Sequence, residues 1–162
     1  LADESATLCR KYGFAYYLAW AEMLGGWAFA VAGGDPAAGL ARFRGGLENF
    51  RAMGAELRIP YYYALLAEVC ALAGRPADAL ANISTGFAFQ SKNGESWAAP
   101  ELHRVHGDLL QTAGNLTEAR VSYTRALEAA RESGAHRFEA RAASRLAGAP
   151  VPQSRARKAP ER

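Results

Sequence analysis

The fold of this chain is decided by residues 101–134, which read ELHRVHGDLLQTAGNLTEARVSYTRALEAARESG. Apolar residues recur at helical spacing until Gly114, where a glycine ends the first predicted helix. Asn115 begins a turn, and Thr117 with Glu118 is typical of the start of a second helix. We therefore predict two antiparallel helices joined by a short turn.

The same pattern recurs every 40 residues along the chain. Glycine, small and aromatic residues all hold this interval, which marks a repeat architecture in which each unit stacks on the next. The triplets with this spacing are Gly34/Gly74/Gly114, Gly54/Gly94/Gly134, Gly39/Ala79/Ala119, Phe43/Ile83/Tyr123, Gly46/Gly86/Ala126 and Leu47/Phe87/Leu127.

We expect an all-α fold, an antiparallel helix-pair solenoid of about three 40-residue repeats with partial helices at both ends. No sustained apolar alternation or hairpin signal predicts a strand. The expected domain covers residues 1–149, with repeats at about 14–53, 54–93 and 94–134 and partial helices at 1–13 and 135–149. Residues 150–162, rich in Pro and Arg, are expected to form a disordered basic tail.

The charge distribution argues against nucleic-acid binding by this domain. The chain has 19 basic and 16 acidic residues, and the tail alone holds four basic residues and one acidic residue. Residues 1–149 therefore carry 15 of each and are neutral. Residues 14–34 have the length of a membrane span, but Glu22 and a Gly25-Gly26 pair favour a buried helix. Cys9 and Cys70 stand alone without metal or disulfide spacing, which is typical of a reduced, cytoplasmic protein.

The stretch of residues 101–134 resembles the tetratricopeptide repeat (TPR) family. It has the small residue Gly107 in its first helix, Ala119 twelve positions later, and then Tyr123 in the second helix. The resemblance implies superhelical stacking of paired helices around a concave binding surface. In the first repeat, Trp27 falls where the family has a small residue. Gly26 beside it indicates a one-residue shift.

Two segments also look like the C-terminal TPR region of large bacterial signalling proteins. They are residues 54–80, GAELRIPYYYALLAEVCALAGRPADAL, and residues 95–110, ESWAAPELHRVHGDLL. In such proteins the repeats follow an ATPase-like module in predicted adenylate cyclases or LuxR-like transcriptional regulators. This resemblance implies a non-catalytic interaction or regulatory arm of a larger bacterial protein.

The resemblance also predicts which residues line the concave surface. They are Tyr61, Glu68, Glu101, Arg104, Asp108 and Gln111 in the second and third repeats. The same register in the first repeat gives Ala21, Leu24, Ala28, Val31 and Ala32. An apolar end of this kind needs cover, so self-association through the first repeat is one expectation. The expected partner is a protein or another domain of the same chain.

Two alternative functions use the same residues. A small ligand could be sensed in the concave groove, with Tyr61, Glu68, Arg104 and Asp108 as its lining. A metal-dependent enzyme at His103 and His106 is the remote alternative. That spacing lacks the further ligands that zinc requires, so the sequence predicts no metal, no cofactor and no catalytic activity in this chain.

Overall fold

The computed structural model describes residues 1–150 and contains only helices as regular secondary structure in that range. The helices are α1 (Ala2–Tyr12), α2 (Ala15–Val31), α3 (Pro36–Ala52), α4 (Ile59–Leu72), α5 (Pro76–Asn93), the 3₁₀ turn η1 (Ser96–Ala98), α6 (Ala99–Thr112), α7 (Leu116–Glu132) and α8 (His136–Gly148). The all-α prediction is confirmed for these residues. The predicted disordered tail falls, from residue 151 onward, outside the described residues.

None of the helices in residues 1–150 is long and apolar enough to cross a lipid bilayer.

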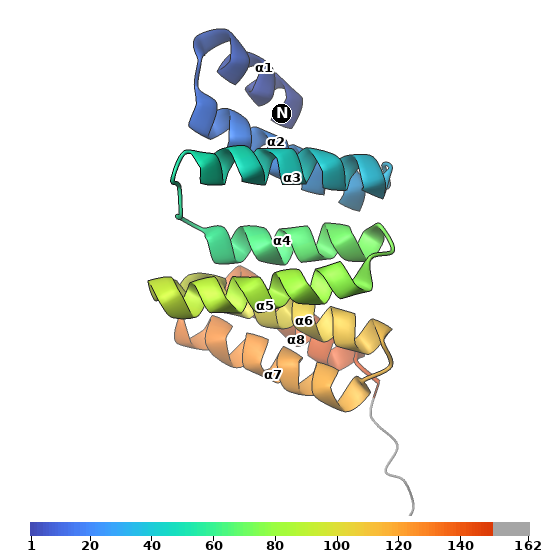
Figure 1. The fold of residues 1–162 in the computed structure, drawn as a ribbon. Helices are drawn as coiled ribbons and strands as arrows, with labels where there is room; N and C mark the ends of the chain where they lie inside the picture. The colour runs from blue at the N-terminus through green and yellow to red at the C-terminus, as the bar shows by residue number, and fades with distance from the viewer. Residues whose placement is uncertain (151–162) are drawn as a thin grey trace, which may run out of the picture.

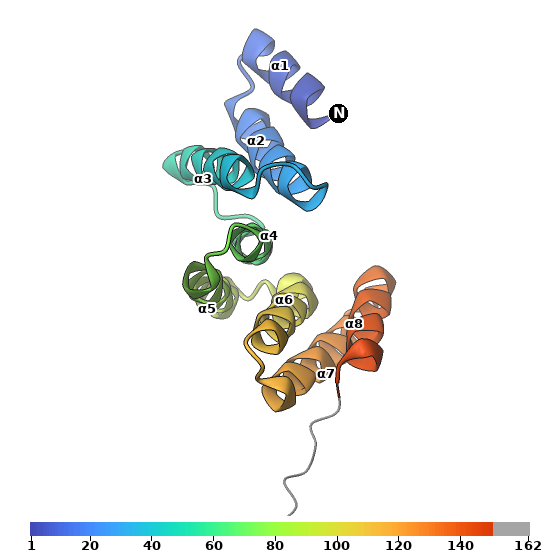
Figure 2. The same ribbon diagram turned by 90° about the vertical axis from the view of Figure 1, so that its right-hand side faces the viewer.

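The helices form successive antiparallel pairs that stack on one another. α2 packs mainly on α3, α4 on α5, and α6 on α7, while α4 joins the pairs through its contacts with α2 and α6. Figure 1 shows these helices as roughly parallel rows, and Figure 2 shows that the stack curves. α2, α4, α6 and α8 lie on the inner side of the curve, and α3 and α5 lie on the outer side (Figure 2).

Glycines at the helix ends explain the repeat seen in the sequence. Seven of them take a left-handed backbone conformation that other residues rarely adopt. These are Gly13, Gly33, Gly54, Gly74, Gly94, Gly114 and Gly134. Five of the seven are those expected from the 40-residue interval. In the first repeat, however, Gly33 rather than Gly34 takes this conformation.

The turn between α2 and α3 contains one residue more than its counterparts. Gly33 and Gly34 precede the N-cap Asp35, whereas only Gly74 or Gly114 precedes the N-cap in the next two repeats. The extra residue moves α2 back by one position relative to α3. Consequently Gly26, and not Trp27, lies at the close approach. A Cβ on Gly26 would come within 2.5 Å of the carbonyl oxygen of Gly39. The suggested one-residue shift is confirmed.

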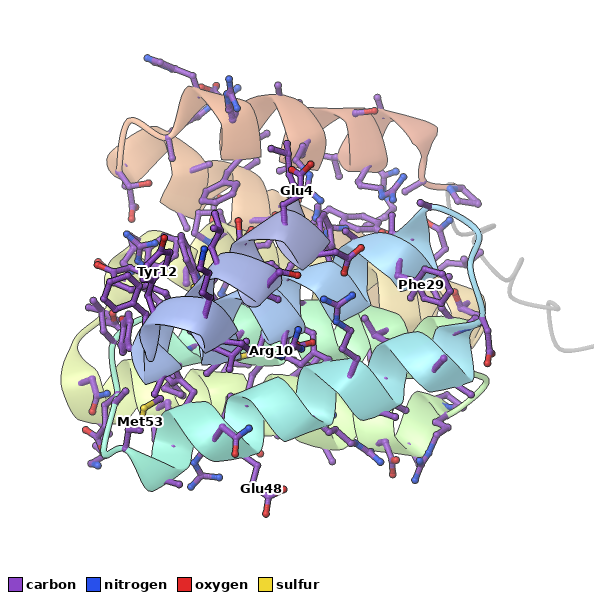
Figure 3. The ribbon with its side chains drawn as sticks, turned by 90° about the horizontal axis from the view of Figure 1, so that it is seen from above. Glu4, Arg10, Tyr12, Phe29, Glu48 and Met53 are labelled. Atoms are coloured by element: carbon purple, nitrogen blue, oxygen red, sulfur yellow. The ribbon has the colours of Figure 1, made fainter. Side chains whose placement is uncertain are left out.

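α1 closes the N-terminal end of the stack. Figure 3, viewed from that end, shows α1 lying across α2 with Arg10 and Tyr12 toward its C-terminal end. Arg10 pairs with Glu22 of α2, and the other oxygen of Glu22 accepts a 2.5 Å hydrogen bond from Arg42 Nε of α3. Arg42 Nη1 also lies 2.8 Å from Asp3 Oδ1. These pairs tie α1 to both helices of the first repeat.

Candidate functional site

A buried ion cluster lies at the centre of the inner side. Arg104 of α6 is only 2% exposed, although it is charged. Its Nη2 donates to Glu101 Oε1 at 2.6 Å, its Nη1 donates to Asp108 Oδ2 at 2.6 Å, and it also pairs with Glu68 of α4. Because helical positions three and four apart lie on one face, Glu101 and Asp108 flank Arg104 on its own helix. Glu68 then links that helix to the neighbouring repeat.

The cluster extends to the helices on both sides of α4 and α6. On the α8 side, Arg141 Nη1 lies 2.7 Å from Glu101 Oε1, and Arg145 Nε lies 2.9 Å from Asp108 Oδ1. On the other side, Trp27 Nε1 of α2 donates to Glu68 Oε2 at 2.8 Å. One polar network, which we call the inner cluster, therefore connects α2, α4, α6 and α8.

The charges of the inner cluster balance. Three arginines face the three carboxylates of Glu68, Glu101 and Asp108. Burial opposes the charged form of Arg104, but the hydrogen bonds and attraction from Glu101 and Glu68 outweigh it and raise the pKa of the guanidinium. Burial also raises the pKa of Tyr123, whose hydroxyl donates to Asp108 Oδ1 at 2.8 Å. Arg104 is therefore charged and Tyr123 neutral at neutral pH.

Five of the six predicted site residues lie in or beside the inner cluster, and the sixth, Tyr61, lies apart from it. Arg104 and Glu101, which is 1% exposed, are buried in the cluster. The side chains of Glu68 and Asp108 keep 19% and 28% of their surface exposed. Gln111 accepts from the Tyr123 hydroxyl at 3.3 Å. Tyr61 lies apart from the cluster, against the ring of Trp97 at 5.3 Å between centroids.

Two of the hollows on the inner side contain predicted site residues or their neighbours. The first, which we call the acidic hollow, has a volume of about 370 Å³. Its walls are mainly apolar, and Glu68 and Asp108 contribute its carboxylates. Its full lining is Val31, Glu68, Ala71, Leu72, Val105, Asp108, Leu109 and Thr112. The hollow thus offers apolar contacts beside two partly exposed carboxylates.

The second, which we call the aromatic hollow, lies at the opposite ends of the same helices and has a volume of about 710 Å³. Rings from α2, α4, η1 and α8 surround it, together with two charged side chains from the connecting segments. Its lining is Trp20, Leu24, Leu57, Arg58, Tyr61, Tyr62, Glu95, Trp97 and Phe138. Of the four residues predicted to line one groove, Tyr61 lines the aromatic hollow, Glu68 and Asp108 line the acidic hollow, and Arg104 lines neither.

Two of the five α2 residues predicted on the inner side, Leu24 and Val31, line the hollows. Because of the extra turn residue, sequence reasoning missed Trp20 and Trp27. In place of the predicted Ala21, Ala28 and Ala32, the residue that precedes each of them in the sequence faces the inner side. Trp20 lines the aromatic hollow, Trp27 bonds to Glu68, and Val31 lines the acidic hollow. The double glycine followed by the Asp35 cap was the signal that could have placed them.

The two histidines lie between α5, α6 and α7. The His103 ring packs on Phe87 with 4.8 Å between centroids, and Nδ1 of His106 shares a 3.1 Å hydrogen bond with Ser122 Oγ. Burial, followed by the charges of Arg125 and His106, lowers the pKa of His103 to about 4. Within residues 1–150, no three His, Cys, Asp or Glu side chains gather as metal ligands would. Ser122 is 4% exposed, so its pairing with His106 joins the helices rather than presenting a nucleophile.

The N-terminal end exposes apolar side chains other than those predicted for the first repeat. Leu8 is 54% exposed and Tyr17 is 58% exposed, and both line a shallow apolar hollow of about 470 Å³ between α1 and α2. Phe29, labelled in Figure 3, is 47% exposed at the far end of α2. Self-association through this surface stays a prediction.

Comparison with known proteins adds one relative. The chain is 32% identical over 121 residues to an uncharacterised protein of Rhizobium meliloti (strain 1021). The match covers 74% of this chain and only 12% of that protein. No protein-family model matches the chain. No solved structure matches it significantly.

Proposed function

We propose that this chain is a non-catalytic, TPR-like helical-repeat module of a larger bacterial signalling or regulatory protein. On this proposal its inner side binds a segment of a partner protein or of another domain of the same protein. The observation that carries the proposal is the arrangement of α2, α4, α6 and α8, whose buried cluster fixes a curved surface with an open hollow on it.

The acidic hollow indicates what the bound segment carries. Leu72, 50% exposed, and Val31, 51% exposed, are apolar side chains in contact with solvent on this surface. Burying such side chains against a partner is favourable by about 25 cal/mol per Å². The carboxylates of Glu68 and Asp108 at the same hollow already pair within the inner cluster, but they stay 19% and 28% exposed, and each carboxylate can accept a further hydrogen bond from a basic group of the bound segment. The expected segment therefore places an apolar side chain next to a Lys or Arg.

The length of the relative supports a role within a larger protein. The stretch similar to this chain makes up 12% of the Rhizobium protein. A stack of this kind offers an extended contact surface on which docking of a neighbouring domain is shifted by a competing ligand.

Selection of peptides from a random library tests this function. We expect the selected peptides to combine apolar and basic residues, and we expect Leu72→Lys to reduce their affinity by at least tenfold. Leu80→Lys is the matched control, since Leu80 is 40% exposed on the outer helix α5. Selected peptides whose binding is equally insensitive to both variants would contradict the proposal. Light scattering of the free chain at the same concentrations separates self-association from peptide binding.

A further inference from the structure

Helix α2 leaves open a face that the later inner helices bury. Leu24 and Ala28 of α2 lie nine and five positions before the left-handed glycine that follows the helix. The residues at the same two positions of the later helices are at most 8% exposed, and they are Leu65 and Val69 in α4 and Val105 and Leu109 in α6. There α4 packs on both α2 and α3, and α6 packs on both α4 and α5, so each has a preceding pair of helices to cover this face. On α2, by contrast, Leu24 is only half-buried and Ala28 is exposed.

Helix α1 presents a small residue at a position where α3 and α5 each receive another helix. Ser5 of α1, Gly46 of α3 and Gly86 of α5 each lie eight positions before the left-handed glycine that follows their helix. A Cβ on Gly46 would come within 2.8 Å of the backbone oxygen of Ala19 in α2. A Cβ on Gly86 would come within 3.2 Å of the Cβ of Tyr63 in α4. The two helices of a pair therefore approach closely at this position, whereas Ser5 is exposed.

The hollow between α1 and α2, which we call the N-terminal hollow, lies where these two surfaces meet and has a volume of about 470 Å³. Among the described residues, no acidic or basic side chain lines it. Its lining is Leu1, Ala2, Ser5, Leu8, Cys9, Tyr17, Trp20, Ala21 and Leu24. Such a lining favours an apolar occupant. It offers few partners for backbone N–H and C=O groups, which a helix, unlike an extended segment, bonds internally.

We propose that the N-terminal hollow binds an apolar helix of the larger protein to which this chain belongs. The helix runs antiparallel to α1, as α2 does to α3, with its backbone near Ser5 and one flank on Leu24 and Ala28. It extends the row of inner helices by one member. The proposal rests on the larger protein of the proposed function, but it uses neither the acidic hollow nor the peptide bound there.

Two observations favour a helix of the same protein over a second copy of this chain. The stretch of the Rhizobium relative that is similar to this chain makes up 12% of that protein, so a protein of this kind has further segments that can supply a helix. A second copy, in contrast, holds its own apolar helix α4 buried within its stack. It therefore has to break its own core to offer that helix.

A tethered helix tests the proposal. A copy of residues 14–41, which contains α2 and the start of α3, is joined directly to Leu1 of the chain. Leu1 and Arg42 each lie twelve positions before a left-handed glycine, so the copied start of α3 continues into α1 in register. We expect the urea midpoint of the extended chain to rise above that of the native chain, because the added helix buries apolar surface. We also expect a thiol reagent to modify Cys9, which lines the hollow, roughly tenfold more slowly, because the helix must first dissociate.

Substitutions in α1 assign the effect to the hollow. Ser5→Trp places a ring where the backbone of the helix should approach, so the extended chain should lose both the higher midpoint and the protection of Cys9. Ser5→Ala should keep both. Thr7→Trp is the matched control, since Thr7 is exposed on α1 and does not line the hollow. In the chain without the tethered helix, Ser5→Trp and Thr7→Trp should have equal, small effects on the urea midpoint, because both residues are exposed there.

Three results would overturn the proposal. The first two are an extended chain with the midpoint and Cys9 reactivity of the native chain, and an equal loss in Ser5→Trp and Thr7→Trp. The third is a dimer of the native chain in light scattering that Ser5→Trp makes monomeric, because a second copy then occupies the hollow. Leu72→Lys should weaken peptide binding and leave the effect of the tethered helix unchanged. Failure of the proposed function and failure of this proposal are therefore separate outcomes.

Discussion

Removing the charge of Arg104 should destabilise the whole inner side of the stack. Arg104→Met keeps much of the side-chain volume but deletes the donors that bind Glu101, Glu68 and Asp108. Breaking a buried ion pair by removing one partner costs about 3–5 kcal/mol, since a buried charge is left uncompensated. Glu101 at 1% exposure keeps only Arg141, so we expect a loss of about 3 kcal/mol, toward the lower end.

A surface pair provides the matched control. Arg44 Nη2 lies 3.1 Å from Asp78 Oδ2, and both side chains are about 40% exposed. Exposed pairs contribute about 0–1 kcal/mol, so Arg44→Met should change the free energy of unfolding by no more than that. Both values are measured by urea denaturation followed by circular dichroism. The m-value is compared among variants, because stacked repeats can unfold in parts.

A double variant separates the buried charge from the loss of packing. If the uncompensated carboxylate is the cause, Arg104→Met combined with Glu101→Leu should recover much of the lost stability, as apolar replacements of buried ion pairs commonly do. The reasoning is refuted if Arg104→Met costs no more than Arg44→Met. It is equally refuted if the double variant loses the sum of both single changes.

Two further predictions concern packing and pH. Gly26→Ala should destabilise the fold by about 1–3 kcal/mol, because its Cβ would lie 2.5 Å from a backbone oxygen of α3. Gly45→Ala, with open space around it, should stabilise the fold by up to about 1 kcal/mol. Equal urea midpoints for the two variants would contradict the close approach of α2 and α3 at Gly26. The pKa of His103 is about 4 in the folded chain and ordinarily 6.5. Between these two pH values the unfolded state binds a proton at His103 that the folded state does not. The contribution of neutral His103 to folding stability is therefore fully present above pH 6.5 and is lost as the pH falls toward 4. That loss amounts to about 2 kcal/mol between pH 7 and pH 5, and a His103→Asn variant with the same pH dependence as the native chain would rule it out.

Much of the fold could be predicted because local signals and tertiary packing agree. The Gly74 and Gly114 turns, the Pro36 and Pro76 starts and the 40-residue interval all mark helix ends, and helices are found at those places. Small residues such as Gly107, whose Cβ would meet the Tyr123 ring, mark where paired helices approach. The side chain at such a position is limited by local geometry, so the pattern can be recognised in the sequence.

The candidate site was predicted only in part, because it depends on distances between helices. Arg104 and Asp108 were both named from their position on α6, yet the burial of Arg104 results from Glu68 on one neighbouring helix and Arg141 on another. Helical periodicity places a residue on a face but does not say which charges from other helices meet it.

The sequence by itself determined the helices, their ends and their pairing, since glycine turns and periodic apolar faces act over a few residues. Tertiary structure alone decided the rest. The extra residue at Gly33-Gly34 rotated α2 by one position, which brought Trp27 to Glu68 and Trp20 to the aromatic hollow. One inserted residue turns a helix by about 100°, so a change of one position selects a different face. Which side chains meet on the inner side is therefore settled only when the helices are packed together.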